Sequence, residues 1–165
     1  MRKTISAFFI LGILSCTNSK IKKNDAYTYN EKLVKVIKNI DSTRNLIGEK
    51  QNENTNELKS EVLTFSTTIN NSLNELGEIN YKSDTLFKNS VIKYVLLNKG
   101  ISEIDIPNII KLKTKLETAN AKDKEEIYTL MYQITENINK NLEGSLKEVE
   151  ISQNIFSKRN NVMLK

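Results

Sequence analysis

The sequence contains no histidine, no tryptophan and only one cysteine in 165 residues. Without histidine there is no imidazole base, no Ser-His-Asp or Cys-His triad, and no metal site that depends on imidazole. A single cysteine cannot form a disulfide within the chain. The glycine patterns of nucleotide-binding loops are also missing. These absences predict a protein that is not an enzyme and that requires neither a cofactor nor a metal ion.

Proline and glycine are scarce as well, with one proline and five glycines. No alternating apolar and polar run bounded by turn residues occurs, so there is little to indicate a sheet. Hydrophobic residues make up 38% and charged residues 27% of the chain, a balance typical of globular proteins. A chain of this length buries roughly two-thirds of its unfolded surface, so one folded domain needs no covalent cross-link.

The chain has a formal net charge of +5, with 25 basic and 20 acidic residues, but only three of the basic residues are arginines. Removal of a segment that contains Arg2 and Lys3 lowers this charge to +3. Base recognition and bidentate phosphate contacts favour arginine over lysine. The composition therefore predicts a mixed, soluble surface with no nucleic-acid partner.

The N-terminus has the organisation of a secretory signal peptide. Arg2 and Lys3 precede an apolar run from Ile5 to Leu14, which is half of the roughly 20 residues that a membrane-spanning helix needs. The run ends in Ile13-Leu14-Ser15-Cys16, which resembles the bacterial lipobox. We therefore predict a lipoprotein signal peptide over residues 1–15, with cleavage between Ser15 and Cys16.

Each position of this motif has a chemical role. The thiol of Cys16 accepts a diacylglycerol as a thioether, the small Ser15 gives the signal peptidase access, and cleavage frees the Cys16 amine for further acylation. A buried free thiol is the ordinary role of a lone cysteine, but here the cysteine stands directly between an apolar run and a polar stretch. We predict that lipid on Cys16 anchors the chain to a membrane. Residues 16–24 are then the lipidated cysteine and a flexible spacer, whose lysines are either solvated or in contact with anionic headgroups.

Apolar residues recur at helical spacing in five later segments, over residues 26–47, 58–76, 86–97, 109–116 and 127–156. Helices with such narrow apolar stripes are not stable alone in water. We therefore predict an all-α fold over residues 25–160, an antiparallel up-down bundle of four long helices and one short helix, followed by a tail at 161–165. Heptads in the first two segments also permit an elongated coiled-coil dimer.

Capping residues indicate where these helices begin and end. Gly48, Gly77 and Gly100 follow apolar stripes, as C-terminal capping glycines do. Ser83 predicts the start of one helix. After a break at 102–107, Asp105 with Pro107 predicts the start of the next. The capping-box spacing of Asp123 and Glu126 predicts the start of the last.

Paired carboxylates are the one remaining kind of acid-base group. The clearest pairs are Glu57 with Glu61 and Glu125 with Glu126. Such pairs are usually no more than a solvated helix face. Nothing in the sequence indicates a cleft around them, so we assign no catalytic residue.

Several tyrosines and hydroxyls are candidates for contacts. Tyr128 and Tyr132 lie four residues apart on one helix face and are candidate partner contacts, whereas Tyr29 and Tyr94 lie on apolar stripes and are expected in the core. Thr43 and Ser72 also interrupt apolar stripes. Such residues can set the helix register or line a small cavity. More commonly, their hydroxyl groups simply form hydrogen bonds within the helix.

Two segments of the body resemble a known family. Residues 25–34, with Tyr-Asn before an aliphatic heptad, and residues 151–161, with Gln153-x-x-Phe156, are similar to the opening and closing segments of small all-helical bacterial surface lipoproteins of uncharacterised function. Ser157 stands where that family is expected to have alanine. The resemblance implies a helical fold and a surface anchor, and it supplies no functional residue.

The sequence thus leads to one functional expectation with two alternatives. We expect a lipid-anchored, non-enzymatic binding module at the cell envelope, on an outer membrane or cell surface rather than an inner membrane, whose partner is an unidentified envelope or host protein. The alternatives are a structural or accessory subunit of an envelope complex and, more remotely, a carboxylate-based hydrolase.

Overall fold

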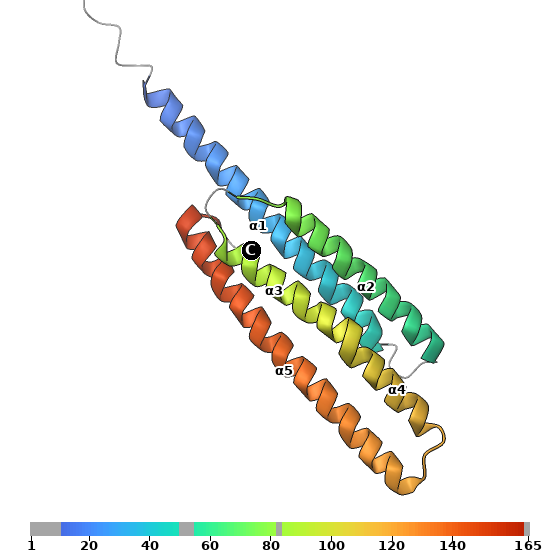
Figure 1. The fold of residues 1–165 in the computed structure, drawn as a ribbon. Helices are drawn as coiled ribbons and strands as arrows, with labels where there is room; N and C mark the ends of the chain where they lie inside the picture. Colours follow the sequence, from blue (N-terminus) through green and yellow to red (C-terminus); the bar gives the residue numbers. More distant parts are fainter. Residues whose placement is uncertain (1–10, 50–54, 82–83, 164–165) are drawn as a thin grey trace, which may run out of the picture.

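The computed structural model describes the backbone of residues 11–49, 55–81 and 84–163, and the side chains of residues 25–48, 55–81 and 84–163. This part of the chain is helical and contains no strand. The elements in order are α1 (Leu11–Glu49), α2 (Thr55–Glu78), α3 (Leu86–Gly100), the π-helical turn η2 (Ile101–Asp105), α4 (Ile106–Leu116) and α5 (Ala121–Asn160). Figure 1 shows them as an up-down antiparallel bundle, which confirms the predicted fold class.

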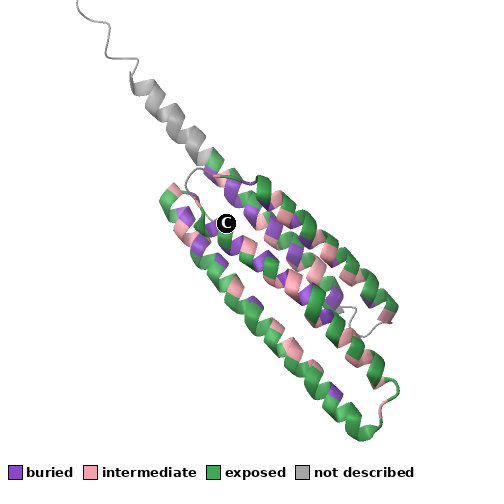
Figure 2. Cartoon of the chain, in the orientation of Figure 1, coloured by how far each residue is buried: buried purple, intermediate pink, exposed green. Residues whose placement is uncertain are grey.

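Apolar stripes on the helices form one continuous core, and exposed residues lie on the outer faces (Figure 2). The predicted spacing holds in α1, where Ala26, Leu33, Val36 and Ile40 are fully buried. Tyr29 and Tyr94 are also buried, as expected. Burial of stripes from different helices against each other supplies the stability that each helix lacks alone.

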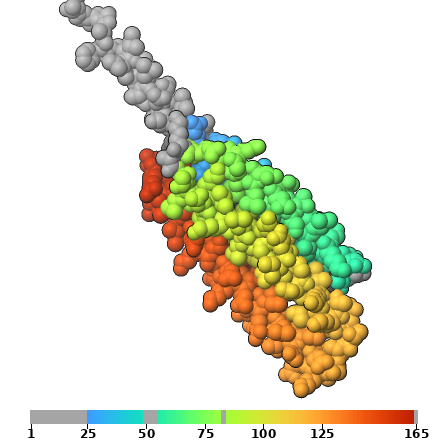
Figure 3. Space-filling view, in the orientation of Figure 1, coloured from blue at the N-terminus to red at the C-terminus, as the bar shows by residue number. Residues whose placement is uncertain are grey.

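Helices α3 and α4 form the centre of the arrangement. Between them they contact α1, α2 and α5, whereas α2 and α5 have no contact with each other. In Figure 3, α3 and α4 lie between α2 and α5 on the visible face. Helix α5 is therefore held in place mainly by α3 and α4, whereas α2 packs on α1 as well as on α3 and α4.

The predicted break at residues 102–107 is wrong. Gly100 and Asp105 both have right-handed helical dihedral angles, so α3, η2 and α4 follow one another without interruption. Ile106 N–H donates to the carbonyl of Ile101, five residues earlier, which is the wider π-helical pattern. Pro107 has no N–H to donate, and the π turn directly before it is where the helix accommodates this loss. Asp105 makes no capping hydrogen bond through its side chain.

Helices α1 and α2 end at Glu49 and Glu78, one residue beyond the predicted glycines, but these glycines do not form left-handed caps. Gly48, Gly77 and Gly100 all lie within helices, and no described glycine has a positive φ. The one described residue with a positive φ is Asn161, at 52°, which ends α5 in a left-handed conformation. Gly100 differs from the other two, because the helix continues past it into η2 and α4.

Residues other than the predicted ones form hydrogen bonds at the starts of α5 and α3. The N-cap of α5 is Asn120, whose side-chain oxygen accepts a hydrogen bond of 3.0 Å from the backbone N–H of Asp123. This cap lies three residues before the predicted Asp123 and Glu126 capping box. At α3, Asp84 Oδ1 accepts a hydrogen bond of 3.3 Å from Phe87 N–H, and Ser83 lies outside the described residues.

Helix α1 begins at Leu11, earlier than the stripe at 26–47 predicts, and its N-terminal part projects past the end of the bundle (Figure 1). The helix includes residues 16–24, which we expected to form a flexible spacer. The structure does not describe the side chains of Ser15 and Cys16. The predicted cleavage and lipid-attachment site therefore lies outside the described side chains. Over the described residues, no helix has a stretch apolar and long enough to cross a bilayer.

An aromatic cluster closes the bundle near the projecting part of α1. Tyr29 lies 5.1 Å from Phe156 and 5.2 Å from Tyr81 between ring centroids, and Phe87 packs on Phe156 at 5.9 Å. The hydroxyls of Tyr29 and Tyr81 donate to Asp84 (2.9 Å) and to the side chain of Asn160 (3.0 Å). Val162, in the predicted tail, is buried in the same core. This end of the molecule is therefore firmly packed.

Candidate functional site

Helix α5 carries a second row of side chains beside its core stripe, and part of this row lies next to α1. The row follows helical spacing and consists of Tyr128, Tyr132, Thr135, Asn139, Leu142, Leu146 and Gln153. At its C-terminal end Gln153 Nε2 donates a hydrogen bond of 2.9 Å to Asn30 Oδ1 on α1. The row is therefore in contact with α1 at Gln153.

Further along, α1 and α5 leave a hollow between them. A cavity of about 490 Å³ is lined on one side by Arg44, Asn45 and Ile47 of α1 and on the other by Asn139 and Leu142 of α5. An adjoining hollow of about 620 Å³ shares four of the same lining residues and extends the space along α5 to Leu146 and Glu150. We call these two adjoining spaces the α1–α5 groove.

One end of the groove is apolar. Five isoleucines from α1, η2, α4 and α5 line it, namely Ile47, Ile101, Ile106, Ile109 and Ile138. Branched side chains in a buried wall keep few rotamers, so this end has a fixed shape. The other end carries polar and charged side chains, which gives the groove two chemically distinct halves.

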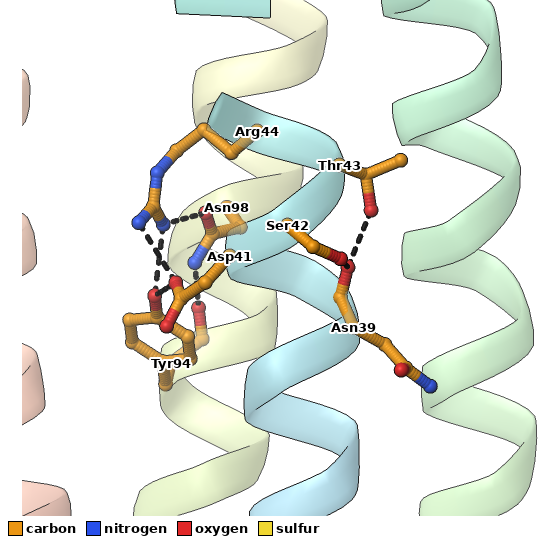
Figure 4. A network of polar contacts seen from close by, with 7 residues as sticks. All are labelled: Asn39, Asp41, Ser42, Thr43, Arg44, Tyr94 and Asn98. Atoms are coloured by element: carbon orange, nitrogen blue, oxygen red, sulfur yellow. Dashed lines mark hydrogen bonds and ion pairs between the residues drawn. The ribbon is translucent and has the colours of Figure 1, made fainter. Parts of the chain in front are cut away.

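Arg44 lies where the two halves meet, and it is held in place by a polar network (Figure 4). Its Nη1 donates to the hydroxyl of Tyr94 and to Oδ1 of Asn98, each at 2.8 Å, and its Nη2 lies 2.7 Å from Asp41 Oδ1. Tyr94 in turn donates its hydroxyl hydrogen to Asp41. The network joins α1 to α3 and fixes the guanidinium beside the groove.

Burial raises the pKa of Tyr94 to about 12, and its hydrogen bond to Asp41 acts in the same direction, while Arg44 acts against both. Tyr94 therefore stays protonated at neutral pH and can donate to Asp41. Arg44 and Asp41 compensate each other's charge, so the network adds no net charge to the groove.

The outer rim of the groove on α5 carries charged side chains of both signs. Glu143 and Glu150 are exposed, line the groove and form no ion pair with any side chain in the described part of the molecule. Lys147 lies between them along the helix. Apart from the compensated Arg44, the charged side chains that line this half therefore leave one excess negative charge.

The predicted contact residues Tyr128 and Tyr132 are exposed by 58% and 65%. They belong to the same row of α5 as Asn139 and Leu146, but neither lines the groove. Sequence spacing thus assigned them correctly to one helix face, and their role as partner contacts stays a prediction.

The two predicted acidic pairs lie in different parts of the fold, and neither lines the α1–α5 groove. Glu57 and Glu61 lie on α2 and Glu125 and Glu126 on α5, two helices that do not contact each other. Burial raises the pKa of the Asp105 carboxyl group. No group of three or more cysteine or acidic side chains suited to a metal ion is found within the described ranges.

The two hydroxyl residues within the stripes also lie outside the groove. Thr43 donates its hydroxyl hydrogen to the carbonyl of Asn39 one turn earlier, which is an ordinary satisfied hydroxyl. Ser72 is buried in α2. Neither lines the α1–α5 groove or the hollow beside α4.

That second hollow, of about 730 Å³, lies between α2 and α4. Its apolar residues include Val62 and Ile110, and Lys59, Lys111 and Lys115 surround them. These lysines are exposed, and none forms a hydrogen bond or ion pair within the described molecule. We regard it as less organised than the α1–α5 groove, where Arg44 is already fixed.

Arg44, Asp41 and Asn98 were not among the residues predicted to be functional. A signal was present, because Asp41 and Arg44 are three residues apart and oppositely charged on the face next to an apolar stripe. Their contacts with Tyr94 and Asn98 depend on how α1 packs on α3, which no spacing within one helix reveals.

The chain matches no protein-family model, and neither curated proteins nor solved structures match it.

Proposed function

We propose that this chain is a bacterial lipoprotein whose helical body is a non-enzymatic binding module at the cell envelope. The observation that carries the proposal is the placement of the sole cysteine, Cys16, at the end of a lipobox-like apolar run. Two or more acyl chains hold a protein at a bilayer, because each buried methylene contributes about 0.8 kcal/mol.

The body has features that suit binding better than catalysis. The α1–α5 groove combines an apolar end with a charged rim, and Arg44 is fixed between them before any ligand arrives. A side chain that is already ordered loses little entropy on binding. The acidic pairs Glu57/Glu61 and Glu125/Glu126 line neither the α1–α5 groove nor the hollow between α2 and α4. We propose an envelope or host protein as the partner, and the outer membrane or cell surface as the location.

The anchor is tested by replacing the thiol. In bacterial cells fed labelled palmitate, we expect Cys16→Ser to lose the label, to retain its signal segment and to leave the membrane fraction. Ser15→Ala is the matched control, because alanine keeps the small side chain that cleavage requires. A Cys16→Ser protein that still takes up label and matures normally contradicts the proposal.

The binding role is tested by crosslinking on intact cells, followed by identification of the captured proteins. We expect a reproducible partner whose capture is lost with Leu146→Glu, which places a charge in the groove, and is retained with Leu63→Glu. Leu63 is a matched control since it is an exposed leucine on α2, away from the groove. Equal capture by both variants contradicts a role for the groove.

A further inference from the structure

We infer that the hollow between α2 and α4, which we call the α2–α4 hollow, is a binding site for a long-chain acyl anion. Such a ligand has one hydrocarbon chain that ends in an anionic group such as a carboxylate. The site is separate from the α1–α5 groove, so the inference goes beyond the proposed binding of an envelope or host protein.

The first support is the size and lining of the hollow. Its volume of about 730 Å³ falls within the range of roughly 300–1,000 Å³ that is typical of small-molecule sites. Val62 on α2 and Pro107 and Ile110 on α4 provide an apolar lining between the two helices. A hydrocarbon chain gains free energy by covering apolar surface of this kind.

The second support is the separation of apolar and basic residues along the hollow. A hydrogen bond between Ser66 of α2 and Ser102 of η2 marks one end. The lining residues nearest to this end along each helix are apolar, namely Val62, Pro107 and Ile110. The basic lining residues lie further from it on both helices, namely Lys59, Lys111 and Lys115. This arrangement matches a ligand with an apolar tail and a charged head.

Two exposed side chains continue the apolar end beyond the lining. Leu63 follows Val62 on α2 and is 70% exposed. Ile104 precedes Pro107 by three residues and is 62% exposed. An acyl chain longer than the hollow therefore passes from its apolar lining onto further apolar surface.

The third support is the charge of the hollow. Lys59, Lys111, Lys115 and Glu117 are its charged lining residues, and they leave an excess of two positive charges. None of the three lysines forms an ion pair in the described part of the chain. Lys115 lies in the last turn of α4, where a basic residue offsets the helix dipole. The dipole does not account for Lys111, which precedes that turn, or for Lys59, which is on another helix.

Neighbouring charged residues do not cancel this excess. Glu103 forms an ion pair with Lys99, with 3.8 Å between Oε1 and Nζ. Glu57, Glu61 and Lys113 do not line the hollow, and each already takes part in another interaction. The uncompensated charge at the basic end is therefore positive.

The donors at the basic end are the ammonium groups. Two threonines also line the hollow, but Thr114 donates its hydroxyl hydrogen to the carbonyl of Ile110 at 3.1 Å, and Thr118 donates to that of Lys115 at 3.5 Å. An anionic head group therefore meets three lysine side chains that are not yet used.

These features disfavour other occupants. An amphipathic helix carries charge along the full length of its apolar stripe, whereas the charges here lie at one end. A second copy docked symmetrically brings the lysines of both hollows together. A small inorganic anion leaves the apolar lining uncovered. Figure 1 shows α4 at the end of the bundle opposite the projecting part of α1, so a bilayer at the N-terminus does not reach the hollow.

The test uses a palmitate analogue with a photoreactive diazirine on its chain, and the methyl ester of the same analogue as the uncharged control. The purified full chain is mixed with either probe and with neutral phosphatidylcholine vesicles, which act as a reservoir for both probes. After irradiation, mass spectrometry locates the labelled residues. We expect the carboxylate to label residues 59–63 and 104–118 about fivefold more than the ester does.

Charge reversal localises the head group. We expect Lys59→Glu/Lys111→Glu to reduce labelling by the carboxylate probe about tenfold. The control, Lys32→Glu/Lys35→Glu, makes the same change in net charge at exposed positions on α1 that line none of the hollows described above. It should keep labelling within about twofold of the parent. Far-ultraviolet circular dichroism checks that both variants are folded.

Filling the hollow localises the chain. Thr114→Trp places a large side chain in the hollow and leaves the three lysines in place, so we expect labelling by the carboxylate to be lost. Thr129→Trp is the matched control. Thr129 is also exposed and also bonds to a carbonyl of its own helix, but it lines no hollow described above.

Five outcomes overturn the inference: equal labelling by acid and ester, equal losses in the two lysine variants, labelling outside residues 59–63 and 104–118, displacement by inorganic phosphate as effective as by unlabelled palmitate, or dimerisation that Lys59→Glu/Lys111→Glu abolishes. The test uses the full chain whether or not its N-terminus carries lipid. Its failure therefore leaves the anchor and the crosslinking experiment untouched, and their failure leaves this result untouched.

Discussion

Gln153 on α5 donates a hydrogen bond of 2.9 Å to the side-chain oxygen of Asn30 on α1, two residues that are 123 positions apart in the chain. Asn30 is 3% exposed. This contact ties the C-terminal part of α5 to α1, and it determines which row of α5 faces the groove.

Gln153→Ala is expected to lower the free energy of unfolding by about 1–3 kcal/mol, because the buried amide of Asn30 loses its partner. Urea unfolding followed by circular dichroism measures the change. Gln133→Ala is the control, since Gln133 is exposed on the same helix, and it should change stability by less than about 0.5 kcal/mol. Equal effects of the two variants would show that the hydrogen bond contributes nothing specific.

Tyr94→Phe is expected to destabilise the protein by about 1–2 kcal/mol at neutral pH, because Arg44 and Asp41 each lose a hydrogen-bond partner. The remaining contact of Arg44 with Asn98 should keep the helices in register. Thermal unfolding measures the loss. Tyr132→Phe removes a hydroxyl from an exposed position and should leave the melting temperature unchanged.

The pH dependence follows from the same residue. A tyrosine in the unfolded chain titrates near 10, whereas burial raises the pKa of Tyr94 to about 12 in the folded protein. The folded state therefore retains a proton that the unfolded state releases, so stability is complete below about pH 10 and falls as pH rises towards 12. Burial also raises the pKa of Tyr29, so Tyr94→Phe should reduce this fall without abolishing it. A variant with an unchanged alkaline profile would contradict this assignment.

Gly144→Ala is expected to stabilise the protein by about 0.5–1 kcal/mol. Gly144 lies inside α5, and a Cβ atom there meets no atom within 4 Å, so alanine gains helix propensity without a clash. The midpoint of urea unfolding should rise at constant slope. No change in the midpoint would mean that α5 is already frayed or unfolded around this residue.

Asn161 ends α5 with φ at 52°, a conformation that glycine and asparagine tolerate better than other residues. Asn161→Ala should cost about 1 kcal/mol, whereas Asn161→Gly should be neutral or slightly stabilising. Thermal unfolding of the two variants compares them directly. If alanine and glycine have the same effect, the left-handed cap is not maintained in solution.

Helical spacing predicted the core well because it is a local property. The stripe from Ala26 to Ile47 and the burial of Tyr29 and Tyr94 depend on which side chains share one face, and the sequence states this directly. Helix ends were predicted less well. Gly100 and Pro107 look like a stop and a start, but burial of Ile101 and Ser102 against the core keeps the helix continuous through a π turn.

The sequence by itself determined an all-α chain with narrow apolar stripes and an N-terminal motif that predicts a lipid anchor, because composition, periodicity and motif are all properties of neighbouring residues. The tertiary structure alone decided that Arg44 meets Tyr94 and Asn98, and that α1 and α5 meet near Asn30 but leave a groove beside Leu142. Those relationships depend on how the helices are rotated and placed against each other. Each stripe specifies the face that a helix buries, whereas the helix that packs there is selected by the combined packing of the whole bundle.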